Sequence, residues 1–134
     1  MRISTKGRHA VMAMLDFARH GGERPVPLAD VAQRQMISLS YLEQLVAKLK
    51  KHGLVKSMRG PGGGYLLAHE PADISLYKIV NAVDPGITAG ERPVFEGDNL
   101  TARQMTDKLW GSLLEEVQKY LKDRSLGDVL NKKV

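Results

Sequence analysis

The sequence predicts a mainly α-helical protein with one small β-hairpin and a long C-terminal helix. Three observations support this fold class. Apolar residues recur at helical spacing in several segments, two short extended runs enclose the glycine-rich stretch RGPGGG, and a proline-free segment near the C-terminus keeps a broad apolar face. With 134 residues, 43% of them hydrophobic, the chain is long enough to bury one modest core, so we expect a single globular unit.

The chain contains no cysteine. This absence excludes disulfides, a thiolate nucleophile and thiolate-bound metals. No apolar run approaches the roughly 18 residues that span a bilayer, and the N-terminal residues lack the apolar segment of a signal peptide. These features predict a cytoplasmic protein with no membrane partner.

The net charge of +5 is concentrated in the first half of the chain. Residues 1–70 contain 11 Lys and Arg against 5 Asp and Glu, whereas residues 71–134 contain 9 against 10. A surface that binds a polyanion needs such a positive region, but many basic proteins bind no nucleic acid specifically. The charge alone leaves nucleic-acid binding open.

Turn residues separate the first two predicted helices. Either Ser4 or Thr5 is a suitable N-cap for a helix that continues to Gly21-Gly22. A second helix, Leu28 to about Arg34, follows the turn PVP. The apolar positions of the first helix are Ala10, Val11, Met14, Leu15, Phe17 and Ala18.

The third predicted helix ends at Gly53, but its start has two candidates. Ser40 and Glu43 have the spacing of a capping box, while Ser38 is an equally suitable N-cap two residues earlier. The residues predicted to face inward are Leu39, Leu42, Leu45, Val46 and Leu49, and those predicted to face outward are Tyr41, Gln44, Lys48 and Lys51.

The stretch RGPGGG, which begins at Arg59, has two candidate roles. A phosphate-binding loop needs Lys and Ser or Thr after its last glycine, and a dinucleotide fingerprint needs a following helix, but YLL follows here. The flanking extended runs instead predict Gly60–Gly64 as a hairpin tip, where glycines allow positive φ angles and close approach to a partner. Arg59 beside this tip is suited to a narrow minor groove of DNA.

Two short helices joined by a tight turn and followed by a basic hairpin are typical of a winged helix-turn-helix, with the hairpin as the wing. The third helix would then occupy a major groove, where Ser40, Glu43 and Gln44 offer hydrogen-bonding groups to base edges and Lys48 offers a cation to phosphate. An ordinary surface helix and a nonspecific nucleic-acid-binding module are the alternatives. A nonspecific module would not need the Glu43 anion, which helps only by accepting a hydrogen bond from a base such as cytosine.

The second half predicts a helix, a loop and a longer helix. Residues 74–83 have helical spacing, residues 84–98 form a polar loop, and residues 99–134 contain a long helix, Leu100 to Lys122, and a short C-terminal helix. The apolar face of the long helix consists of Met105, Leu109, Trp110, Leu113, Leu114, Val117, Tyr120 and Leu121. Such a wide face fits either a dimerisation helix or the core helix of a monomer.

The opening MRISTKGRHAVMAMLDFA, the helix SLSYLEQLVAKLKKHGLV and the wing RGPGGGYLL resemble the bacterial winged-helix regulators of the IscR, NsrR and CymR type, closely over residues 1–83 and more loosely beyond. The resemblance implies a homodimeric transcription regulator, usually a repressor, that binds a palindromic site in double-stranded DNA through residues 1–83. It also implies dimerisation through the long helix. The DNA contacts that we expect are Arg2, Lys6, Ser38, Ser40, Tyr41, Glu43, Gln44, Lys48, Arg59, Gly60, Pro61, Gly62 and Gly63.

The loop before the long helix departs from that family. IscR-like and NsrR-like members hold an iron-sulfur cluster there with three cysteines, whereas this chain offers Arg92, Asp98, Gln104 and Asp107, which cannot replace thiolates. We expect no cofactor and a naturally cluster-free member of the CymR type; a cysteine-substituted cluster sensor is the alternative. The scattered histidines and acids predict neither a metal site nor an enzyme. Residues 84–104 are candidates for binding a small effector or a partner protein.

Overall fold

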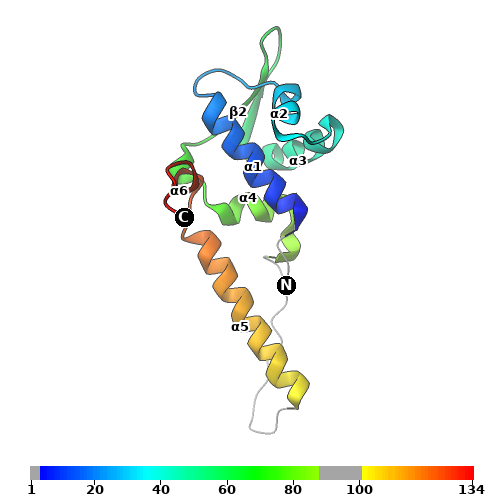
Figure 1. Ribbon diagram of the computed structural model, residues 1–134, viewed down its shortest axis with the longest axis vertical. Helices are drawn as coiled ribbons and strands as arrows, with labels where there is room; N and C mark the ends of the chain where they lie inside the picture. Colours follow the sequence, from blue (N-terminus) through cyan, green and yellow to red (C-terminus); the bar gives the residue numbers. More distant parts are fainter. Residues whose placement is uncertain (1–3, 88–100) are drawn as a thin grey trace.

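The computed structural model describes residues 4–87 and 101–134 of the chain (Figure 1). These residues form a mainly helical body, one β-hairpin and a long helix, as the sequence predicts. The elements are α1 Thr5–His20, α2 Leu28–Gln35, α3 Leu39–Lys51, β1 Val55–Met58, β2 Gly64–Leu67, the 3-10 helices η1 Pro71–Asp73 and η2 Pro85–Ile87, α4 Leu76–Val83, α5 Ala102–Lys122 and α6 Leu126–Leu130.

The core lies where α1, α3 and α4 pack together. Phe17 and Met14 of α1 are buried in it, together with Leu45 of α3 and Ile79 of α4. The apolar residues recur at helical spacing, so each helix presents them on one face. The core forms where these faces pack together. In Figure 1, α2 and α3 lie beside α1, and α4 lies between this body and α5.

Hydroxyl side chains cap five of the six described α-helices. In each of them the side-chain oxygen of the N-cap accepts a hydrogen bond from the backbone N–H of the third helical residue, which stabilises a helix by about 1 kcal/mol. These caps are Ser4, Ser38, Ser75, Thr101 and Ser125.

Residues 74–83 differ from the single predicted helix. The segment begins as an extended link, and α4 starts only at Leu76, behind its cap Ser75. The cause is a tertiary contact: the backbone N–H of Leu76 donates to the carbonyl of Arg124, and the N–H of Leu126 donates to the carbonyl of Ile74. The pairing holds the C-terminal segment against the body.

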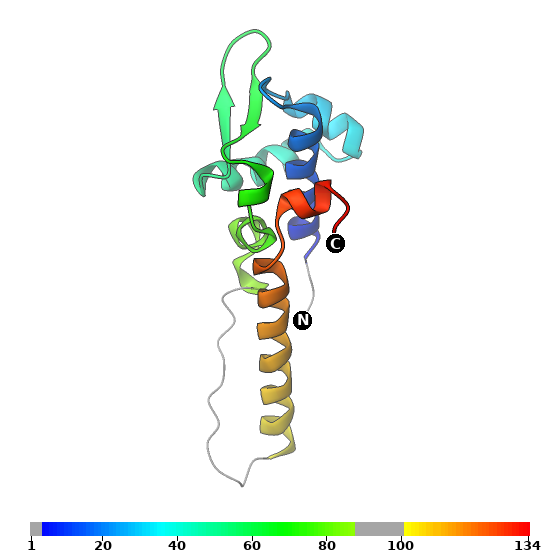
Figure 2. The same cartoon turned by 90° about the vertical axis from the view of Figure 1, so that its left-hand side faces the viewer.

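The helix α5 extends away from the body (Figure 2). Within the described part of the chain, it is anchored at its C-terminal end, through Leu121, which is buried in the core, and through Leu114 and Val117, which pack at the margin of the core. The short helix α6 then folds back beside η1 and α1. Among the described residues, no helix has the length and apolar character needed to cross a membrane.

Candidate nucleic-acid interface

The helix α3 starts at Leu39 because Ser38 caps it. The Ser38 hydroxyl accepts a hydrogen bond from the N–H of Tyr41 at 3.2 Å. Of the two predicted caps, Ser38 is therefore the one that the structure uses. Ser40 lies inside the first turn, with an exposed side chain.

One side of α3 is exposed and polar. The opposite side packs into the core through the buried residues Leu42, Leu45, Val46 and Leu49. The exposed residues that were predicted as DNA contacts are Ser40, Glu43, Gln44 and Lys48. The last turn also carries Lys50 and Lys51, and the first turn contains no acidic residue. The arrangement offers hydrogen-bonding groups flanked by cations.

Two predictions about the faces of α3 are wrong. Leu39 was expected inside, but its side chain is 41% exposed. Tyr41 was expected to face outward, but it is half-buried, and its hydroxyl forms a 2.9 Å hydrogen bond with Nδ1 of His9 on α1. Burial raises the pKa of Tyr41. This tyrosine therefore ties α3 to α1.

A buried ion pair fixes α1 against α2. The side chain of Asp16 is fully buried, and its carboxylate accepts hydrogen bonds from Arg34 at 2.7 and 3.0 Å and from Gln35 at 2.8 Å. Burial by itself raises the pKa of Asp16, but these hydrogen bonds and the Arg34 charge outweigh burial and bring the pKa below its ordinary value. This cluster is not among the residues predicted from the sequence. The sequence feature that could have indicated it is Asp16, an acidic residue within the apolar face of α1.

The wing is an antiparallel hairpin in which Val55 pairs with Leu67 and Met58 pairs with Gly64. Residues 59–63 form its tip. Gly60 and Gly62 have positive φ angles of 102° and 74°, as the predicted turn requires. Gly64, predicted in the tip, belongs to β2 instead.

The base of the wing is held by backbone pairing. The N–H of Val26 donates to the carbonyl of Tyr65 at 2.9 Å, and the N–H of Tyr65 donates back to Val26 at 2.9 Å. A Cβ on Gly64 would collide with the Val26 carbonyl, so this close approach requires glycine. The α1–α2 connection thus acts as a third, one-residue strand.

Charged residues of the wing and of α1 complete the surface. Arg59 and Pro61 are exposed at the wing tip, and Lys6 is exposed in the first turn of α1. The ammonium group of Lys50 donates a 2.8 Å hydrogen bond to the Ser57 hydroxyl, which links α3 to the wing. Arg2 lies outside the described residues.

No set of three or more potential metal ligands gathers within residues 4–87 and 101–134. The imidazole of His52, beside the wing, contacts the Lys48 carbonyl through Nδ1 at 2.9 Å.

A capped, exposed polar helix preceded by a short helix and followed by a basic glycine-tipped hairpin defines a winged helix-turn-helix protein. The comparisons agree. The sequence profile of the Rrf2 family, described as iron-dependent transcriptional regulator, matches residues 3–132. The chain belongs to the Rrf2 family of transcriptional regulators, which are not enzymes.

Relatives of known sequence or structure lie in the same family. The chain is 47% identical to the HTH-type transcriptional regulator IscR of Serratia proteamaculans, over 98% of this chain and 80% of the relative. Among solved structures, IscR of T. potens has a TM-score of 0.79 and 38% identity, covering 100% of this chain and 89% of that one. CymR, the global cysteine regulator of B. subtilis, has a TM-score of 0.80 and 35% identity, covering 98% of each chain.

The residues of this chain do not fit a cysteine-ligated iron-sulfur cluster. Such clusters are held mainly by thiolates, and the sequence contains none. In the described part, Gln104 is occupied in the capping box of α5, where its side chain accepts from the Thr101 N–H at 2.9 Å. Of the other predicted residues, Asp107 lies within α5, and Arg92 and Asp98 lie outside the described residues.

Proposed function

We propose that the chain acts as a homodimer that binds a palindromic promoter site and represses transcription without a cysteine-ligated cluster. Two copies would place their α3 helices in successive major-groove faces about 34 Å apart along B-DNA. The wings would lie over the flanking minor grooves, with Arg59 in them. A DNA-binding regulator of this kind would work in the cytoplasm.

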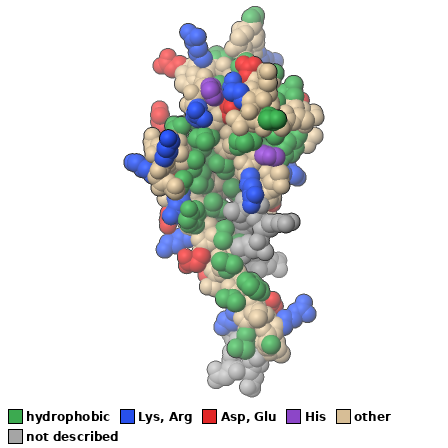
Figure 3. All heavy atoms as spheres, viewed as in Figure 1, with side chains coloured by type: hydrophobic (Ala, Val, Ile, Leu, Met, Phe, Trp, Pro, Cys, Tyr) green, Lys and Arg blue, Asp and Glu red, His purple; other side chains and the backbone are tan. Residues whose placement is uncertain are grey.

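The observation that carries the proposal is the uncovered apolar face of α5. Five large apolar side chains of this helix are 43% to 60% exposed: Met105, Leu109, Trp110, Leu113 and Tyr120. Monomeric proteins rarely expose so many large apolar groups along one helix. In Figure 3, green side chains continue along α5 below the body. Among the described residues, no element covers these side chains, which supports the dimer over the monomer-core alternative.

The face does not include every residue that was predicted for it. Leu121 is buried in the core of its own chain, and Leu114 and Val117 are half-buried against it. They anchor α5 rather than extend the open face. The exposed residues therefore lie mainly in the N-terminal two-thirds of the helix.

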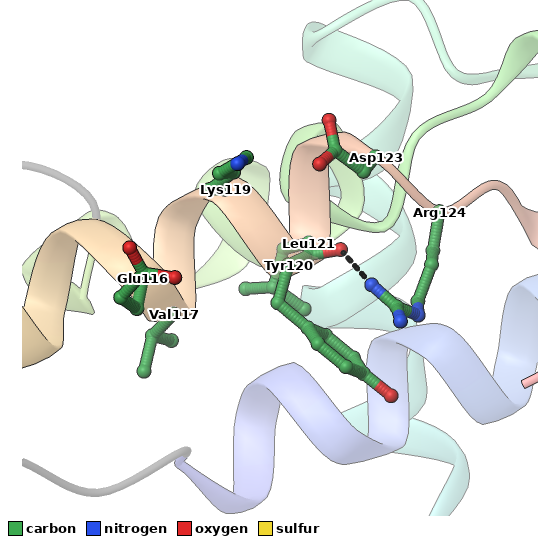
Figure 4. Close-up of a pocket in the computed structure, with 7 residues that line it drawn as sticks. All are labelled: Glu116, Val117, Lys119, Tyr120, Leu121, Asp123 and Arg124. Atoms are coloured by element: carbon green, nitrogen blue, oxygen red, sulfur yellow. Dashed lines mark hydrogen bonds between the residues drawn. The ribbon is translucent and has the colours of Figure 1, made fainter.

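At the anchored end, a hollow of about 460 Å³ continues this face (Figure 4). The guanidinium of Arg124 stacks over the ring of Tyr120, 3.4 Å from its centroid, and Val117 lines the same hollow. An apolar floor with a charged rim suits the side chains of a second copy. The hollow supports the proposed dimer as a continuation of the open face.

Sedimentation of Trp110→Glu tests the dimer. Because Trp110 is 55% exposed, the substitution should leave the fold intact and convert a dimer into a monomer at micromolar concentration. Lys108→Glu is the matched control, since Lys108 is exposed on the polar side of α5 and its dimer should persist. A wild-type monomer would refute the proposal.

Footprinting tests the DNA site and the absence of a cluster together. Protein purified with and without oxygen should protect the same palindrome in its own upstream region at about 150 mM salt, a concentration at which nonspecific binding is weak. Protection only after anaerobic purification would favour a redox-sensing cofactor instead. A cysteine-substituted cluster sensor would predict that restoring three cysteines before α5 restores an iron-sulfur spectrum.

The nonspecific nucleic-acid module is the remaining alternative. The exposed carboxylate of Glu43 on the polar side of α3 separates the two functions. Glu43→Ala should change sequence preference in a specific regulator, whereas it should only tighten binding in a nonspecific module. If an effector or partner protein controls binding, we place it at residues 84–104, and adding it should shift operator affinity.

A further inference from the structure

We propose that Leu39 contacts the 5-methyl group of a thymine adjacent to the base pair contacted by Glu43. Leu39 would thereby add a base preference that polar contacts alone do not supply. The inference rests on the proposed function, because it requires α3 to occupy a major groove.

The position of Leu39 in α3 is the first argument. Leu39 is the first residue after the N-cap Ser38, at the end of the helix that meets base edges in helix-turn-helix proteins. Its side chain is 41% exposed, although the inward face of α3 is complete without it. Nearby, Met36 in the connecting turn is 91% exposed. The start of α3 is thus an apolar spot on a polar surface.

The neighbours of Leu39 supply the second argument. Glu43 is four residues on, so its Cβ lies roughly 5 to 6 Å from that of Leu39 on the helix surface. Helical side chains lean toward the N-terminus, which brings the Glu43 carboxylate over the first turn. A base that donates to Glu43 would therefore have its neighbouring base close to Leu39.

The charge around Leu39 favours DNA over a protein partner. The first turn of α3 contains no acidic residue, and the exposed side of the helix ends in Lys48, Lys50 and Lys51. An apolar side chain within such a basic surface suits a groove lined by phosphates. The thymine methyl is the apolar group that the major groove presents. Burying it against leucine should strengthen binding about four-fold per half-site.

The experiment uses full-length protein and an operator selected from random DNA. Each thymine of the selected site is replaced by deoxyuridine, which keeps every hydrogen-bonding group and removes the methyl. Wild-type protein should lose about four-fold in affinity at one thymine per half-site. Leu39→Ala should bind more weakly and show no loss at that thymine. Leu39→Met, which retains a large apolar side chain, should still bind more weakly when that thymine is replaced by deoxyuridine.

Ser40→Ala is the matched control, because it removes a neighbouring exposed polar group. Ser40→Ala should weaken binding equally to the thymine-containing operator and to the deoxyuridine-substituted operator. The inference is overturned if no deoxyuridine weakens wild-type binding, or if Leu39→Ala retains the same thymine dependence. A protein that enriches no site from random DNA would instead overturn the proposed function, and the inference with it.

Discussion

Replacing Asp16 with asparagine should lower the free energy of unfolding by about 2 kcal/mol at pH 7. Removing one partner of a buried ion pair typically costs about 3 to 5 kcal/mol. Here the Asp16 side chain is fully buried, but that of Arg34 is 34% exposed. Water can therefore solvate the released guanidinium, which reduces the cost to about 2 kcal/mol. The corresponding fall in Tm is roughly 6 °C.

The pH dependence of the same variant follows from the lowered pKa of Asp16. A carboxyl whose pKa is depressed by folding contributes stability that is complete above its unfolded pKa of about 3.9 and is lost as the pH falls through the folded pKa. The difference between wild type and Asp16→Asn should therefore be constant from pH 7 to about pH 5, and it should shrink below about pH 4.

Urea unfolding followed by circular dichroism measures this difference. Protein concentration must be held fixed, because dimerisation would add to the apparent stability. Asp73→Asn is the control, since Asp73 is exposed, and its substitution should leave stability within about 0.5 kcal/mol of wild type. A difference under 0.5 kcal/mol for Asp16→Asn, or one that persists unchanged to about pH 3, would show that the buried pair does not hold α1 to α2.

Three further substitutions test the turn, the base of the wing and its tip. Met36 has a φ angle of 56°, so Met36→Gly should raise the free energy of unfolding by roughly 0.5 to 1 kcal/mol in a urea titration, whereas Met36→Ala, equally strained, should not. Gly64→Ala should lower stability by about 2 kcal/mol and weaken DNA binding, because the new Cβ collides with the Val26 carbonyl; unchanged stability would mean that the wing is not held there. Arg59→Ala should weaken operator binding by about 1 to 3 kcal/mol in a titration if the arginine enters a groove, and equal affinity would remove the wing from the interface.

The helices and the wing could be predicted because their signals are local. Gly53 ends α3 with a φ angle of 73°, and its N–H bonds the Lys50 carbonyl while the next N–H bonds that of Leu49. This is a Schellman motif, in which glycine is strongly favoured. The hairpin tip likewise depends on glycines at positive φ. Such features are fixed by neighbouring residues in the chain.

The wrong predictions concern residues whose burial or hydrogen-bond partner depends on residues distant in the sequence. Tyr41 and Leu39 lie at the edges of the apolar stripe of α3, where helical spacing does not determine burial. His9, on another helix, draws Tyr41 inward. The partners of Asp16 lie 18 and 19 residues along the chain, so no spacing rule identifies them. Whether the apolar face of α5 is covered is also a tertiary property, and the sequence left it open.

Among the described residues, α5 is attached to the body only near Leu121, so a small rotation there moves its far end. The helix has 21 residues, so it is about 31 Å long, and a tilt of about 10° at Leu121 would move its far end by about 5 Å. If two such helices meet along their open faces, the tilt sets the separation of the two α3 helices. A small change in packing around Leu121 would then alter the half-site spacing that the pair can span. Operator preference would then depend on the packing around Leu121, which contacts no DNA.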